Sequence, residues 1–207
     1  MMEAFKRIKG IAAPFPQANI DTDRIIPSSE LVRAQSEGHA ASLFSSERYL
    51  TNREPNPDFL LNIPPFDNAT ILVAGENFGT GSSREAAPVA LREFGFRVVV
   101  ASSFGGIFYN NCFMNGILPI ELPLEDILKT PQAISGAQAI ELVVDLEANT
   151  ITTEGGKVLA FQVPTIARQM LLEGKDDIDL TLDDSRAIHD HWQADRQVRP
   201  WIDLAVS

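Results

Sequence analysis

The stretch that decides the fold runs from Thr70 to Leu122 and reads TILVAGENFGTGSSREAAPVALREFGFRVVVASSFGGIFYNNCFMNGILPIEL. It contains three short apolar runs, at residues 71–74, 98–101 and 118–122, with helix-length segments between them. Short apolar runs that alternate with helices are typical of parallel strands joined by crossover helices. We therefore predict an α/β fold with a mostly parallel sheet flanked by helices.

A glycine-rich loop, GENFGTGSSREAAP at residues 75–88, follows the first of these strands. It matches neither a Walker A loop, nor a dinucleotide fingerprint, nor a G-x-S-x-G nucleophile elbow. Its last part carries Ser82, Ser83 and Arg84, where the next helix is predicted to begin. A helix start offers free N–H groups, and a guanidinium can bind both oxygens of a carboxylate. We predict an anion site here, with a serine that can be drawn into proton transfer.

Pro88 leaves two possible starts for this helix. A start near Ala86 places the proline in the first turn, whereas a start at Ser83 requires a kink. Ser82 and Glu85 have the spacing of a capping box, which favours the earlier start. The plain structural interpretation of Ser82 is therefore a helix N-cap.

The N-terminal part of the chain contributes one strand and two irregular segments. Residues 5–13 are predicted to form an opening strand, and residues 28–50 a mixture of helix and loop. The prolines within residues 54–66 exclude a regular helix or a central strand. Since this stretch is rich in Phe and Leu, we predict an ordered arm packed on a surface rather than a linker.

The C-terminal part is predicted to be a meander followed by helices. Short β-rich runs at residues 139–145, 150–153 and 157–163 form the meander, and helices at 164–172 and 184–196 close the chain. We predict a single domain over residues 1–207, with residues 184–207 as a C-terminal helical tail.

The composition indicates an ordinary globular protein, with 207 residues of which 44% are hydrophobic and 22% charged. The net charge of −11, without a basic cluster, argues against a nucleic-acid partner. We see no apolar run that would predict a signal peptide or a membrane span. The single cysteine, Cys112, fits a reducing cytoplasm and cannot by itself hold an iron–sulfur cluster or a structural zinc.

Three motifs stand in order along residues 5–185. They are NIDTDRIIP at 19–27, EPNPDFLLN at 54–62, and the glycine-rich loop together with SSFGGIFYNNCFMNGILPIEL at 102–122. Together they resemble the family of 3-isopropylmalate dehydratase (isopropylmalate isomerase) small subunits, the swivel-domain members of the aconitase superfamily. The resemblance implies a compact β/β/α swivelling domain that docks on a separate large subunit. That partner would carry the [4Fe-4S] cluster on three cysteines, and this chain alone would bind no cofactor or metal.

The resemblance also implies roles for residues of the loop. Ser82 matches the family's catalytic base, which takes the proton from the carbon next to a carboxylate and returns it on rehydration. Arg84 matches the clamp for a substrate carboxylate. Ser83 matches a second substrate contact. Independently of the resemblance, Gly81 can let the backbone approach a ligand or turn with a positive φ.

Outside the loop, the resemblance singles out two further positions. Asp23 matches an aspartate that faces the active site and orients a histidine of the large subunit. Arg33 lies in the segment that shapes substrate choice in this family, and His39 follows in the same segment. Turn chemistry explains Asp21 and Thr22, which we expect to be structural caps.

The implied reaction isomerises 2- and 3-isopropylmalate, small dicarboxylates of leucine biosynthesis, by dehydration and rehydration. Two alternatives remain open. Thr80 and Ala86 stand where the family loop, G-C-G-S-S-R-E-H-A-P, has cysteine and histidine, so a paralogue acting on citraconate/methylmalate or 2,3-dimethylmalate is possible. The other alternative is a non-catalytic assembly or regulatory subunit, against which the retention of Ser82, Ser83 and Arg84 argues.

Overall fold

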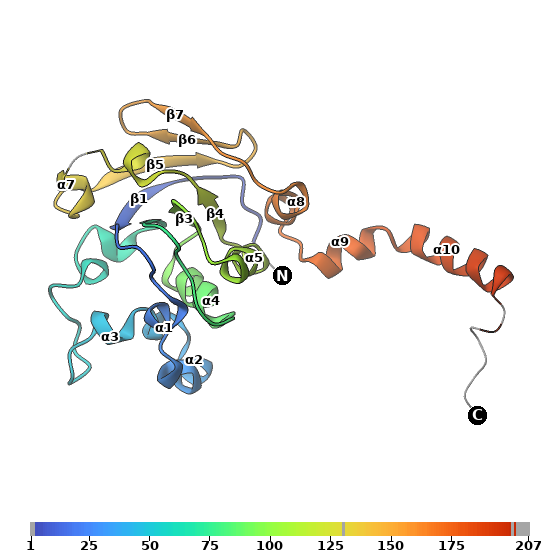
Figure 1. The fold of residues 1–207 in the computed structure, drawn as a ribbon, viewed down its shortest axis with the longest axis horizontal. Coiled ribbons are helices and arrows are strands. Elements are labelled where there is room, and N and C mark those ends of the chain that lie inside the picture. Colours follow the sequence, from blue (N-terminus) through green and yellow to red (C-terminus); the bar gives the residue numbers. More distant parts are fainter. Residues whose placement is uncertain (1–2, 130, 200, 202–207) are drawn as a thin grey trace.

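One sheet of seven strands organises the described part of the chain, residues 3–129, 131–199 and 201 of the computed structural model (Figure 1). The strands lie side by side in the order β4-β3-β2-β1-β5-β6-β7. Their bounds are β1 (Arg7–Phe15), β2 (Ile71–Ala74), β3 (Val98–Ala101), β4 (Leu118–Glu121), β5 (Ile140–Asp145), β6 (Thr150–Thr153) and β7 (Val158–Ala160).

The predicted α/β class is confirmed, but the sheet is mixed rather than mostly parallel. Strands β1 to β4 pair in parallel, as the alternation of strands and helices predicted. The meander β5–β7 is antiparallel, and β5 pairs with β1 over the register Arg7↔Asp145 to Ala12↔Ile140. Because β1 takes β2 on one side and β5 on the other, the meander extends the same sheet.

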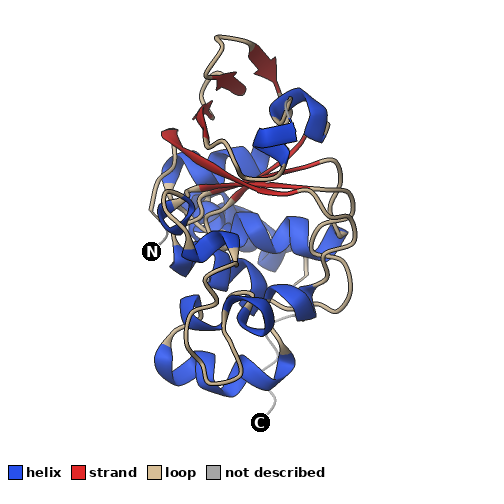
Figure 2. Ribbon diagram, turned by 90° about the vertical axis from the view of Figure 1, so that its left-hand side faces the viewer, coloured by secondary structure: helices blue, strands red, loops and turns tan. Residues whose placement is uncertain are grey.

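Helices cover both faces of the sheet, and Figure 2 shows the central strands nearly edge-on with most helices on one side. The helix bounds are α1 (Thr22–Ile25), α2 (Leu31–Glu37), α3 (Ser45–Arg48), α4 (Ala86–Phe94), α5 (Gly106–Met114), α6 (Leu124–Ile127), α7 (Pro131–Ile134), α8 (Thr165–Glu173), α9 (Asp177–Asp183) and α10 (Ser185–Val198).

Two hydrophobic cores lie on opposite faces of the sheet, because successive strand residues point in opposite directions. On one face, Leu72 and Val99 pack with buried residues of α4 and α5. On the other face, Val73 and Val100 pack with residues of α6, α8 and the meander. Both faces of the parallel strands are therefore buried, which explains why these strands are apolar without alternation.

The proline-rich stretch 54–66 is the ordered arm that its composition predicted. Leu61 and Phe66 are buried, and the Phe59 ring packs edge-on against Phe15 with 6.0 Å between centroids. The side-chain amide of Asn62 donates to the carbonyl of Arg48 at 2.7 Å, which ties the arm to α3. The arm thus closes the core under the N-terminal segment.

Helix α4 begins at Ala86, so the predicted start at Ser83 with a capping box is wrong. Its N-cap is Glu85, and no side chain caps it. A helix from Ser83 would place the ring of Pro88 against the carbonyl of Arg84, which an α-helix does not tolerate. With the start at Ala86, the proline lies in the first turn, where its missing N–H is not needed. Ser82 therefore caps no helix and belongs to the loop.

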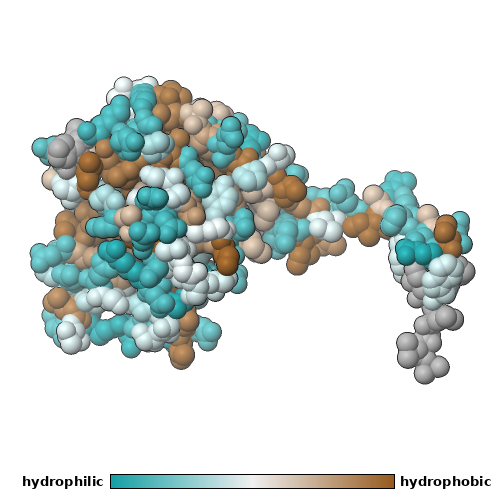
Figure 3. Space-filling model, in the orientation of Figure 1, coloured by the Kyte–Doolittle hydropathy of each residue, from teal (hydrophilic) through white to brown (hydrophobic). Residues whose placement is uncertain are grey.

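The C-terminal helices α9 and α10 lead away from the body (Figure 1), and Figure 3 shows brown apolar patches along them. Neither helix has a buried residue, and Ile188 and Trp192 of α10 are about half exposed. Helix α10 confirms the helix predicted at 184–196. Residues 1–2 of the predicted domain and 202–207 of the predicted tail lie outside the described residues. No helix in the described ranges is long and apolar enough to cross a membrane.

Candidate active site

Three loops meet at the carboxyl ends of the parallel strands β1, β2 and β3. The backbone N–H of Gly79, after β2, donates to the carbonyl of Ile20, after β1, at 2.7 Å. On its other side, Phe78 accepts at 2.9 Å from the N–H of Gly105, which follows β3. Ligands of open α/β sheets bind at this edge of the parallel strands.

Glycines let the middle loop lie this close to its neighbours. Gly79 has a φ of +72°, and a Cβ on it would lie 2.2 Å from the ring of Phe108. Gly81 has a φ of +96°, which side chains rarely adopt, and its ideal Cβ position is 3.6 Å from Thr22 Oγ1. The predicted role of Gly81 in letting the backbone turn is consistent with this conformation.

Arg84 and Asp23 form a two-pronged ion pair between the second loop and α1. Arg84 Nη1 donates to Asp23 Oδ1 at 2.5 Å, and Nη2 donates to Oδ2 at 2.6 Å. Nη1 also donates to the carbonyl of Ile26 at 3.0 Å. The Arg84 side chain is only 15% exposed, whereas that of Asp23 is 56% exposed. The guanidinium hydrogen bonds hold the pKa of the Asp23 carboxyl below its usual value.

Ser82 is exposed beside this pair, and its main contact is with Thr22. The Thr22 hydroxyl donates to the carbonyl of Ser82 at 3.0 Å and lies 3.4 Å from Ser82 Oγ. The backbone N–H of Thr22 donates to the carbonyl of Thr80 at 2.9 Å, so the two loops are joined on both sides of Gly81. Ser83 is also exposed, next to Ser82.

Helix α1 is short but firmly held, which fixes Asp23 in its first turn. As predicted, Asp21 is its N-cap and accepts from the N–H of Arg24 at 2.7 Å. The Arg24 side chain makes two hydrogen bonds to Glu47 of α3, at 2.6 and 3.0 Å. Thr22, the other predicted cap, is instead the first residue of α1, and its hydroxyl donates to the carbonyl of Ser82 across the fold.

The predicted specificity segment lies beside the loops without contributing a side chain to the ion pair. Arg33 of α2 forms a salt bridge to Glu30 at 3.8 Å. His39 is bound to α4, because its Nδ1 lies 3.0 Å from Glu93 Oε1 and its backbone N–H donates to the same carboxylate. The structure therefore brings Asp23, Ser82 and Arg84 together but gives Arg33 a partner on its own segment.

Two contacts at and beside the site were not predicted from the sequence. One is the hydrogen bond between Thr22 and Ser82, and the other is the contact between Glu93 and His39. They join residues that are 60 and 54 positions apart. For the Thr22–Ser82 contact, the only signal in the sequence was the place of Thr22 between two aspartates of the motif at residues 19–27. For the second, the sequence offered no signal.

The two departures from the family loop affect positions that act through the backbone or through packing. Thr80 accepts from the N–H of Thr22 and forms an isolated bridge with Asp21. Ala86 is the first residue of α4 and packs against the core at partial burial. Within the described ranges, the Thr80 side chain makes no hydrogen bond to Ser82 or Arg84, and Ala86 has no polar side chain to make one.

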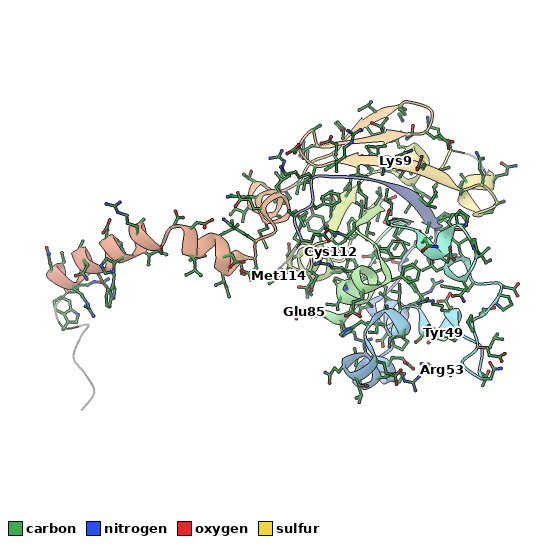
Figure 4. The ribbon with its side chains drawn as sticks, turned by 180° about the vertical axis from the view of Figure 1, so that it is seen from behind. Lys9, Tyr49, Arg53, Glu85, Cys112 and Met114 are labelled. Atoms are coloured by element: carbon green, nitrogen blue, oxygen red, sulfur yellow. The ribbon has the colours of Figure 1, made fainter. Side chains whose placement is uncertain are left out.

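The metal-binding chemistry of the chain is limited by its one thiol. Cys112 of α5 lies inside the body (Figure 4) and is fully buried, which raises the pKa of the thiol well above its usual value. Within the described ranges, no group of three or more His, Cys, Asp and Glu side chains could hold a metal ion. His189 and His191 are exposed on α10. One cysteine cannot supply the three thiolates that an aconitase-type cluster requires.

Comparisons with known proteins identify the family to which the chain belongs. The model of the aconitase C-terminal domain family matches residues 2–125. Small subunits of 3-isopropylmalate dehydratase from Sinorhizobium medicae and Rhizobium meliloti are 48% and 50% identical to the chain, over 97% of it and 100% of each relative. The solved structure of 3-isopropylmalate dehydratase from Methanocaldococcus jannaschii superimposes with a TM-score of 0.65 at 27% identity, over 89% of this chain and 98% of that one. The chain therefore belongs to the aconitase C-terminal domain family, among the small subunits of 3-isopropylmalate dehydratase.

Proposed function

We propose that the chain is the small subunit of a hydro-lyase that interconverts 2- and 3-isopropylmalate, by dehydration and rehydration, in leucine biosynthesis. The observation that carries this proposal is the joined set of Ser82, Arg84 and Asp23 at the carboxyl ends of the parallel strands. Family membership supplies the reaction class, and these residues supply a base and a carboxylate clamp, which such a reaction needs from the protein.

Ser82 is the base of the proposal. Its side chain is exposed and, because it caps no helix, it is not committed to the backbone of α4. Its alkoxide would take the proton from the carbon next to a substrate carboxylate, and the resulting hydroxyl would return that proton during rehydration. Arg84, two residues further along the loop, carries a positive charge that would favour the negatively charged form of such a base.

Arg84 is the clamp of the proposal, and one edge of its guanidinium would bind the substrate. Asp23 occupies the edge formed by Nη1 and Nη2, and the carbonyl of Ile26 takes a further hydrogen of Nη1. The edge formed by Nε and the second hydrogen of Nη2 has no protein acceptor within residues 3–129, 131–199 and 201. A substrate carboxylate can accept two parallel hydrogen bonds there. Asp23 then holds the clamp in place, and a contact of Asp23 with a histidine of the partner stays a prediction.

The partner in this proposal is a large subunit that carries the [4Fe-4S] cluster. When bound by the partner, such a cluster would supply Lewis-acid chemistry for the loss of the substrate hydroxyl. In this proposal the chain contributes no ligand to the cluster, and its residues bind and orient the dicarboxylate and move the proton at Ser82.

We place the reaction in the cytoplasm, which suits a chain with one cysteine. We also propose that residues 1–207 form one swivel domain and that residues 184–207 are its helical tail.

The test is co-expression with a cluster-bearing large subunit, followed by anaerobic assays on a panel of 2-isopropylmalate, 3-isopropylmalate, citraconate and 2,3-dimethylmalate. We expect the complex to turn over both isopropylmalates best. A preference for citraconate or 2,3-dimethylmalate would replace the substrate assignment with the paralogue. An assembled complex with an intact cluster and no turnover of any of these acids would contradict the catalytic role.

A further inference from the structure

Thr22 is a polar side chain in an unusual place. It is only 2% exposed, although it lies in the first turn of a short surface helix next to the exposed Ser82. The Thr22 hydroxyl lies within hydrogen-bond distance of two oxygens of Ser82, the carbonyl oxygen at 3.0 Å and the side-chain Oγ at 3.4 Å. Water has little access to Thr22, so solvent cannot easily replace its hydroxyl.

Counting hydrogens shows what this arrangement can do. A threonine hydroxyl has one hydrogen to donate and lone pairs that accept. While Ser82 is protonated, Thr22 donates to the Ser82 carbonyl, and the Ser82 hydroxyl can donate to Thr22 Oγ1. When Ser82 has lost its proton, Oγ becomes the stronger acceptor, because hydrogen bonds to ionised groups are stronger than those to neutral ones. A small rotation of the Thr22 hydroxyl then moves its hydrogen from the carbonyl to the alkoxide.

We propose that Thr22 is a positioning residue that donates a hydrogen bond to the deprotonated side chain at position 82. Thr22 keeps its own proton throughout, and only its hydrogen-bond acceptor changes. The inference deepens the proposed function, since it rests on Ser82 as the base of that reaction. A merely structural Thr22 would join the two loops equally well in both protonation states of residue 82.

A thiol at position 82 allows a test that needs neither partner nor turnover. In the Ser82→Cys chain, the pKa of the introduced thiol is measured from the pH dependence of its alkylation. The parent chain is the matched control, because its only thiol, Cys112, is buried and should not react. Adding Thr22→Val should raise the pKa of the introduced thiol by about one to two pH units, the size expected for losing a hydrogen bond to a charged group. Adding Thr22→Ser, which keeps the hydroxyl, should leave that pKa unchanged.

One further variant separates the electrostatic effect on the thiol pKa from loosening of the loop. Asp21→Ala removes the cap of α1 and a negative charge, so it should leave the thiol pKa unchanged or lower it. A rise as large as that caused by Thr22→Val would show that loop disorder, and not the lost donor, moves the pKa. Equal pKa values with Thr, Ser and Val at position 22 would overturn the proposal. Should Thr22→Val not fold, Thr22→Ala provides the same comparison.

Kinetics of the complex with the large subunit provide a second, independent test of the role of Thr22. Thr22→Val should lower kcat about 10²-fold with little change in KM and move the acid limb of the kcat profile to higher pH, whereas Thr22→Ser should restore both. If the parent complex is active, Ser82→Ala is inactive and Thr22→Val is fully active, the inference about Thr22 fails and the proposed function stands. If the parent complex is inactive on every acid, the proposed function fails, and the thiol titration still decides the role of Thr22.

Discussion

Replacing Arg84 with lysine tests the clamp directly. The substitution keeps a positive charge at the end of the loop, but it removes the planar fork that holds Asp23 through two hydrogen bonds. The Asp23 carboxylate is exposed at the surface, so the ion pair contributes little to folding, and we expect the variant to fold and to bind its partner.

The expected loss in catalysis follows from the number of hydrogen bonds. The guanidinium offers two parallel N–H groups to the substrate carboxylate, and an ammonium without its Asp23 support offers at most one in a fixed position. One hydrogen bond to a charged group contributes about 1.5–3 kcal/mol. Since each 1.36 kcal/mol is tenfold in rate, kcat/KM should fall by about 10- to 150-fold.

The assay measures kcat/KM for several dicarboxylates that differ in their alkyl group, with a common large subunit. Arg84→Lys should lower every value by a similar factor, because all the substrates share the carboxylate. The matched control is Arg97→Lys, which removes a similarly buried guanidinium with two hydrogen bonds to Glu3, just before β3 and away from the loops, and should leave the rates nearly unchanged. Arg33→Ala should instead change the ranking of the alkyl groups. If Arg84→Lys reorders the panel without lowering it as a whole, the assignment of clamp and specificity roles is reversed.

Three further predictions concern the packing of Gly79, the reactivity of the single thiol, and the iron content and activity of the isolated chain. Gly79→Ala should lower the free energy of unfolding by about 3 kcal/mol in urea titrations, because the new Cβ meets the Phe108 ring and φ is positive, whereas Gly155→Ala, with open space around it, should not. The buried thiol of Cys112, with its raised pKa, should resist alkylation in the folded chain and react only on unfolding. The purified chain alone should contain no iron or labile sulfide and show no turnover, and a coloured, active chain would refute the subunit assignment.

The sequence predicted the strands well because burial on both faces leaves a direct mark. The runs at 71–74, 98–101 and 150–153 coincide with β2, β3 and β6, since their apolar or β-branched residues have few alternatives. Helix α4 was placed too early, because the serine–glutamate spacing suggested a cap that Pro88 forbids. Helix α9 was not predicted, because its apolar residues alternate with polar ones rather than following the period of a helix, and none of them is buried.

The candidate site shows a similar limit. The loop motif identified Ser82 and Arg84, and a second motif identified Asp23, but the sequence could not show that Asp23 and Arg84, 61 positions apart, hold each other. The Thr22–Ser82 contact has the same origin, since it depends on how the loops after β1 and β2 lie side by side. Local patterns specify elements, whereas such pairings depend on the sheet order that places the loops together.

The most direct test of the central claim is the turnover number of the Ser82→Ala complex on 2-isopropylmalate, measured together with its thermal stability. Because Ser82 caps no helix and is exposed, the free energy of unfolding should change by less than about 0.5 kcal/mol. Loss of a positioned base should lower kcat by about 10²- to 10⁴-fold. A complex that keeps its cluster, its partner and a near-normal kcat without the Ser82 hydroxyl would contradict the account.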